Sequence, residues 1–144
     1  HRRQRQMCIR DSYYKMEEII LENRNDLSEY LKDTDYDFVV LKFSAEWCKP
    51  CKIVKPIIEN TLKEVDVKIN GSDKKYIFIE VDVDECFDLY AFLKQKKMIN
   101  GIPAIFLYSK KIYKNVEDNK LYIPQASISG TKEDQIKKVL HLIQ

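Results

Sequence analysis

Apolar runs and helical stripes alternate along this chain of 144 residues. Several runs are β-branched or aromatic and close to continuously apolar, a pattern typical of strands buried on both faces of a sheet. The predicted strands are 18–22, 38–43, 76–83 and 104–108, with an edge strand at 121–129. The last strand is placed at an edge because Pro124 has no backbone N–H to give to a second neighbour.

Between these runs, apolar residues recur at the three- and four-residue spacing of helices. The longest stripe follows Lys49 and comprises Val54, Ile57, Ile58, Leu62 and Val65. A short helix is also expected at 25–32, because Asn25 and Asp26 offer an N-cap just before its apolar residues.

Two further helices complete the pattern. Asp84 is expected to cap one of them, with Phe87 turned inward, and Thr131 to begin the other. The order predicts one α/β domain over 13–144, with a central mixed sheet of about five strands flanked by about four helices. The charged stretch 109–120, before the edge strand, is expected to be a hairpin-like excursion.

The first ten residues differ in composition from the rest. They hold four of the five arginines, whereas the remainder has 20 lysines and only Arg24. We therefore interpret residues 1–12 as a non-native or disordered tail, with a native basic extension as the alternative. Without those four arginines, 21 basic residues stand against 23 acidic ones, so charge gives no reason to expect a nucleic-acid partner.

The four cysteines, at positions 8, 48, 51 and 86, are too few and too unevenly spaced for a disulfide-stapled secreted domain. No apolar run approaches the roughly 18–20 residues that span a bilayer. No apolar segment of a secretory signal follows the basic start. We expect a reducing, cytoplasmic location, while a secretory or organellar one stays open because the start of the chain is suspect.

The most informative motif is Trp47-Cys48-Lys49-Pro50-Cys51, where a predicted strand runs into a predicted helix. Residues three apart on a helix have Cβ atoms about 5–6 Å apart, so a small adjustment closes a disulfide. The helix N-terminus offers unpaired N–H groups and a positive dipole end, which favour a thiolate. Cys48 is therefore predicted to be the attacking nucleophile and Cys51 the resolving thiol. Pro50 fits the first helical turn, where its missing N–H breaks no bond.

Two other interpretations of the cysteine pair are possible. The pair could be half of a zinc site, but Cys8 and Cys86 stand alone and the only histidines are His1 and His141. It could also be a pair of inert, buried thiols. The tryptophan before the pair and the proline within it favour a redox centre over both, so no metal is expected.

The run from Phe43 to Lys52 resembles the active-site segment of the thioredoxin family. The resemblance covers about residues 18–143. The stretch 80–85 resembles the family's third strand and the turn after it, 101–104 its loop ending in a cis-proline, and 129–130 the turn before its last helix. The resemblance implies the thioredoxin fold and a protein-disulfide reductase that works by dithiol–disulfide exchange.

The same resemblance implies a set of partners. Pro103 would be cis and packed against the cysteine pair, shaping a substrate groove together with Trp47 and Ile102. Substrates would be protein disulfides, and an enzyme resembling thioredoxin reductase would recharge the pair. The chain is expected to be a monomer without a membrane or nucleic-acid partner. It has no glycine-rich fingerprint and is therefore expected to bind no cofactor, its redox group being the Cys48–Cys51 disulfide.

Lys49 departs from the family pattern, which usually has glycine between the cysteines. We expect its charge, beside the helix N-terminus, to lower the pKa of Cys48 further and to make the disulfide more oxidising. The alternative is a solvated surface lysine without influence on the site.

Lys42 is the second departure. It stands where the family usually has a buried aspartate that helps to move the proton of the resolving thiol, and Glu80 falls at about the position of that aspartate's neighbour. Since an unpaired buried charge is costly, we expect a charge-reversed Lys42–Glu80 pair under Cys51, with Glu80 as the proton acceptor. The alternative is that Lys42 extends to solvent and is neutral. Cys86 is expected to be structural.

Three functions are compatible with these residues. The leading one is a dithiol reductant. The second is an oxidase or isomerase in an oxidising compartment, to which Lys49 points weakly. The third is a non-catalytic thioredoxin-like binding module, for which Lys42 leaves room and against which the intact cysteine pair argues.

Overall fold

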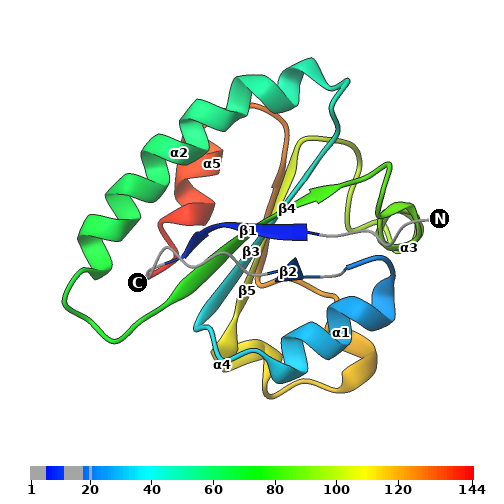
Figure 1. Ribbon diagram of the computed structural model, residues 1–144, viewed down its shortest axis with the longest axis horizontal. Coiled ribbons are helices and arrows are strands. Elements are labelled where there is room, and N and C mark those ends of the chain that lie inside the picture. The colour runs from blue at the N-terminus through cyan, green and yellow to red at the C-terminus, as the bar shows by residue number, and fades with distance from the viewer. Residues whose placement is uncertain (1–5, 12–17, 20) are drawn as a thin grey trace.

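A computed structural model describes residues 6–11, 18–19 and 21–144 of the chain (Figure 1). The strands are β1 (Gln6–Asp11), β2 (Glu18–Ile19), β3 (Phe38–Ser44), β4 (Tyr76–Asp82), β5 (Ala104–Ser109) and β6 (Ala126–Ser129). The helices are α1 (Arg24–Asp33), α2 (Lys49–Ile69), α3 (Phe87–Gln95), α4 (Lys110–Tyr113) and α5 (Glu133–Leu140), with a 3-10 turn at Asp118–Lys120.

The strands form one mixed sheet in the order β2-β1-β4-β3-β5-β6. Its centre is β3, which runs parallel to β4 and antiparallel to β5. Every residue of β3 is buried, because helices cover both faces of the sheet. The register pairs Phe38 with Tyr76 and Ser44 with Asp82, so β3 and β4 end side by side. Whatever follows these two strands therefore meets at one edge of the sheet.

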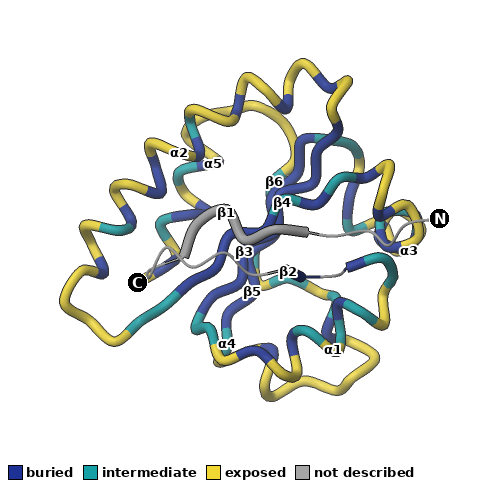
Figure 2. Tube along the Cα trace, viewed as in Figure 1, coloured by how far each residue is buried: buried dark blue, intermediate teal, exposed yellow. Residues whose placement is uncertain are grey.

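Side chains of β3 alternate between the two faces, as the strand period requires. Val39, Leu41 and Phe43 lie in a core cluster with residues of α1 and α3, whereas Phe38 and Val40 lie in a second cluster with residues of α2 and α5. Figure 1 shows α2 and α5 together on one side of the strands and α1 on the other. Figure 2 shows the buried positions concentrated on the central strands and on the inner faces of these helices.

The predicted α/β architecture is confirmed, with six strands in the described residues rather than about five. The additional strand is β1, which pairs antiparallel with β4. It lies in the segment interpreted as a tail, whose residues 1–5 and 12 are outside the described part of the chain. The non-native origin of that segment stays a prediction. No helix among the described residues is long and apolar enough to cross a membrane.

The first helix begins earlier than its predicted cap. Its N-cap is Asn23, whose side-chain oxygen accepts a hydrogen bond of 3.0 Å from the backbone N–H of Asp26. The Asp26 carboxylate in turn accepts from the N–H of Asn23 at 3.3 Å. This reciprocal capping box satisfies two N–H groups at once, which makes Asn23 a better cap than Asn25.

The third helix begins later than predicted, and the inward placement of Phe87 is wrong. The helix starts after Cys86, and Phe87 is 67% exposed. Asp84 does not cap it, because the Asp84 carboxylate is bonded to another side chain, described below. The edge strand is also shorter than predicted, since β6 begins after Pro124.

Candidate active site

The cysteine pair lies where β3 passes into α2. Cys48 is the N-cap residue of α2, with an extended backbone (φ −90°, ψ 105°), and its Sγ accepts a hydrogen bond of 3.2 Å from the backbone N–H of Cys51. Pro50 lies in the first turn of α2, where no N–H is needed. A disulfide joins Cys48 to Cys51, whose Cα atoms are 5.3 Å apart. The helix thus directs a polarised N–H at the first sulfur of a closed redox pair.

The cysteine pair is buried, whereas the tryptophan before it is exposed. Cys48 and Cys51 are each 3% exposed, whereas Trp47 is 67% exposed. Both cysteines belong to the core cluster that includes Ala104, and Ile102 packs against this cluster from its edge. A partner that reaches the sulfurs must therefore lie over a small apolar surface.

The peptide bond between Ile102 and Pro103 is cis. Pro103 directly precedes β5, and Ala104 at the start of β5 pairs with Phe43 near the end of β3. The backbone N–H of Gly130 donates to the carbonyl of Pro103 at 2.9 Å, which ties this loop to the end of β6. The cis-proline loop is thereby held beside the junction that carries the cysteines.

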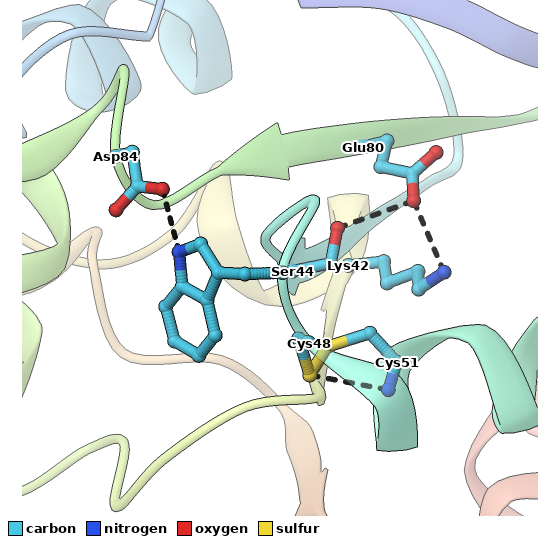
Figure 3. Close-up of a disulfide and its surroundings, with 7 residues drawn as sticks. Lys42, Ser44, Cys48, Cys51, Glu80 and Asp84 are labelled. Carbon is cyan, nitrogen blue, oxygen red and sulfur yellow. Dashed lines mark hydrogen bonds and ion pairs between the residues drawn. A yellow bond between two sulfur atoms is a disulfide. The ribbon is translucent and has the colours of Figure 1, made fainter.

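The Trp47 side chain is held by a residue that the sequence did not single out for the site. Its Nε1 donates a hydrogen bond of 2.8 Å to Oδ2 of Asp84 (Figure 3). Asp84 is itself fixed, since its backbone N–H donates to Oδ1 of Asp82 at 2.8 Å. The register of the strands could have predicted this contact. Parallel strands that end together bring the residues after β4 next to those after β3.

Lys42 and Glu80 form an ion pair on the neighbouring strands β3 and β4. The Lys42 Nζ lies 3.0 Å from Oε2 of Glu80, and the hydroxyl of Ser44 donates to the same oxygen at 3.2 Å. The Lys42 side chain is 4% exposed and that of Glu80 is 37% exposed. Lys42 therefore does not extend to solvent, and the expected charge-reversed pair is present in the structure.

The remaining chemistry-bearing residues lie elsewhere. Cys86 is fully buried in the core cluster of the cysteine pair, as a structural residue would be. His141 lies at the end of α5, with its Nε2 2.8 Å from Oε1 of Glu64. This hydrogen bond, with Lys137 nearby, lowers the pKa of Glu64. Glu64 follows Cys51 by 13 residues along α2, about 20 Å at the helical rise. Within the described ranges, no three histidine, cysteine or acidic side chains group as metal ligands.

Comparisons with known proteins agree with this geometry. The family model of thioredoxin matches residues 18–140. A thioredoxin of Oryctolagus cuniculus is 40% identical over 78 residues, which are 54% of this chain and 67% of that protein. Thioredoxin domain-containing protein 2 of Mus musculus is 29% identical over 99 residues, or 68% of this chain, but the match spans only 16% of that protein.

Solved structures show the same fold. A structure of the thioredoxin of Plasmodium falciparum superposes with a TM-score of 0.55 at 21% sequence identity. The match covers 85% of this chain and 96% of that one. At this identity the likeness shows only a shared arrangement of strands and helices. The chemistry of the site is inferred from the geometry of the cysteine pair.

Proposed function

Because this chain belongs to the thioredoxin family and closes a disulfide between its two site cysteines, we propose that it is a reductant of protein disulfides. Its activity is that of a thiol–disulfide oxidoreductase. The observation that supports this most directly is the place of Cys48 at the N-cap of α2, where the N–H of Cys51 bonds its sulfur. That bond and the helix dipole stabilise a thiolate at Cys48 once the disulfide is reduced.

The reaction proceeds by two exchanges at sulfur. The Cys48 thiolate attacks one sulfur of the substrate disulfide, forms a mixed disulfide and releases the first substrate thiolate. Cys51, as a thiolate, then attacks Cys48, re-forms the Cys48–Cys51 bond and releases the second substrate thiolate. Water protonates the released thiolates, and two electrons pass from the dithiol to the substrate.

Trp47, Ile102 and Pro103 serve as the substrate groove in this proposal. Trp47 is exposed and oriented by Asp84, while Ile102 is half-buried beside the cis-proline. An extended polypeptide can lie on such a surface with its disulfide over the sulfurs. Apolar contact with these three residues would raise the affinity for protein disulfides above that for small disulfides.

Asp84→Ala is expected to raise KM for a protein disulfide about threefold to tenfold, because Trp47 loses the hydrogen bond that fixes its ring. The rate with a small aromatic disulfide should change less than twofold, since that probe needs no groove. Steady-state kinetics with both substrates would measure this. Equal losses with both substrates would show that Asp84 acts on the cysteines and not on the groove.

A reductant must be regenerated, so we propose a reductase that takes electrons from a nicotinamide cofactor through its own redox centre. This chain would contribute only its Cys48–Cys51 disulfide, bind no cofactor and act as a monomer. A reducing compartment such as the cytoplasm would keep the pair in its dithiol form.

Lys49→Gly is expected to raise the pKa of the Cys48 thiol, because a cation beside the helix N-terminus favours the thiolate. Lys49 is exposed, so water screens much of its charge. Thiolate absorbance of the reduced protein against pH would give the value. An unchanged pKa in Lys49→Gly would mean that the side chain is only a solvated surface group.

The function is tested by reduction of insulin disulfides with dithiothreitol as the electron source. A reductase accelerates the reaction catalytically, whereas a binding module of the same fold leaves it at the uncatalysed rate. The equilibrium of the disulfide with glutathione then distinguishes a reductant from an oxidase, since a reductant's disulfide resists reduction by glutathione.

A further inference from the structure

A cavity lies between α1, the end of α3 and the segment that follows α4, on the face of the sheet opposite α2. Figure 1 shows the segment after α4 folded beside α1. The volume of the cavity is about 580 Å³, and small-molecule sites usually measure about 300–1,000 Å³. Three separate parts of the chain therefore line one opening of ligand size, and none of its lining residues belongs to the redox site.

The segment after α4 is fastened at both ends. The Lys32 Nζ on α1 lies 2.9 Å from Oδ2 of Asp118, which begins the 3-10 turn, and the Lys114 Nζ donates to the backbone carbonyl of Lys32. Further along, the hydroxyl of Tyr108 on β5 donates to the carbonyl of Tyr122 at 2.8 Å. These contacts hold the walls in place before any ligand binds, so binding would require little ordering of the chain.

Two aromatic rings line the cavity. Phe92 is buried in the core cluster beneath α1 and α3, and Tyr122 is half-buried against the same cluster. Their ring centroids are 5.0 Å apart with an interplanar angle of 74°, a favourable edge-to-face contact. The rings provide apolar surface on which the carbon part of a ligand can rest.

Two exposed cations border these rings. The guanidinium carbon of Arg24 lies 4.3 Å from the centroid of Phe92. The Lys96 Nζ lies 5.8 Å from the same centroid and 6.0 Å from that of Tyr122. A ring positions a cation without accepting its N–H groups in ordinary hydrogen bonds. In the part of the chain that the structure describes, no carboxylate pairs with either cation, so both keep donors for an anion.

Charge and apolar surface together define the ligand. Of the two carboxylates that line the cavity, Asp118 is paired with Lys32, which leaves Glu29 against Arg24 and Lys96. This excess of one positive charge attracts anions. A bare inorganic anion would leave the rings and most of the volume unused. We propose that the cavity binds a small organic anion, with its phosphate or carboxylate at the two unpaired cations and its planar part against the two rings.

Calorimetric titration of the full chain with matched pairs of probes tests this ligand class. Adenosine monophosphate is compared with adenosine, and indoleacetate with indoleacetamide, so that each pair differs in the anionic group. At least one of the two anions should bind with a Kd below about 1 mM and at least about tenfold more tightly than its neutral partner. Which anion binds distinguishes a phosphate from a carboxylate ligand.

Two outcomes of these titrations would overturn the proposal. One is that neither anion binds, or that each binds no better than its neutral partner. The other is that inorganic phosphate, which has the charge without the ring, binds as tightly as the better organic anion. The second outcome would show that the rings contribute nothing to binding.

Substitutions then test whether the anion binds in this cavity. Arg24→Met and Lys96→Met should each weaken binding about fivefold to tenfold, because each removes one of the two unpaired cations. Lys94→Met is the matched control, since the Lys94 Nζ lies 5.5 Å from the centroid of Tyr90 on the same helix but outside the cavity. It should leave Kd within about twofold. Unchanged binding in both cavity variants, with wild-type thermal melts, would place the ligand elsewhere and contradict the proposal.

Discussion

Cys48→Ser is expected to lower the rate of insulin reduction by at least about a thousandfold, because a serine hydroxyl is not ionised at neutral pH and cannot attack sulfur. The fold should survive the change. Serine keeps a side-chain acceptor for the N–H of Cys51, which Cys48 now satisfies at the N-cap of α2. The measurement is the rate of insulin reduction per molecule of protein at a fixed dithiothreitol concentration.

Cys86→Ala is the matched control for this prediction. Cys86 is fully buried in the same core cluster but lies outside the disulfide. Its replacement should cost some stability and leave the rate within about twofold. If Cys86→Ala abolished the reaction while Cys48→Ser retained it, the attacking thiol would have been assigned to the wrong cysteine.

The sequence predicted the parts of the site that depend on local pattern. The junction of β3 with α2 followed from an apolar run that ends at Cys48 and from a helical stripe that begins after it. The need for an anion beside Lys42 could also be anticipated, because Lys42 falls in a buried strand, but the choice of Glu80 as that anion came from the family resemblance. The cis form of Pro103 came from family resemblance alone, because nothing in the local sequence requires it.

The features that the sequence did not predict depend on strand register and on which hydrogen-bond partner a side chain meets in the fold. An aspartate directly after a strand looks like a helix cap, so the sequence predicts a cap at Asp84. The parallel register of β3 with β4 instead places Asp84 beside the indole of Trp47. Similarly, composition separated the first residues from the rest of the chain but could not predict that Gln6–Asp11 pairs with β4. Both outcomes depend on which segments meet in space.

Cys51→Ser is expected to separate the two exchanges, because it removes the resolving thiol and leaves the attacking one in place. The bond to Cys48 comes from the backbone N–H of residue 51, which serine also has. When the reduced variant is mixed with dithiobis-nitrobenzoate, an aromatic disulfide whose released thiolate is coloured, the attack by Cys48 should therefore release the first thiolate at close to the wild-type rate. The mixed disulfide should then persist at least about a thousandfold longer, because an external thiol at millimolar concentration replaces an intramolecular one.

The persistence of that adduct decides how the two cysteines share the reaction. Mass spectrometry of acid-quenched Cys51→Ser should show one nitrobenzoate thiol attached through Cys48, and catalytic insulin reduction should be lost. The reverse variant, Cys48→Ser, should form little adduct, because the N-cap position that favours a thiolate belongs to residue 48, whereas Cys51 lies inside the first turn of α2. An adduct that forms equally well on either variant would mean that both sulfurs accept substrate, and the N-cap position of Cys48 would then not determine which thiol attacks.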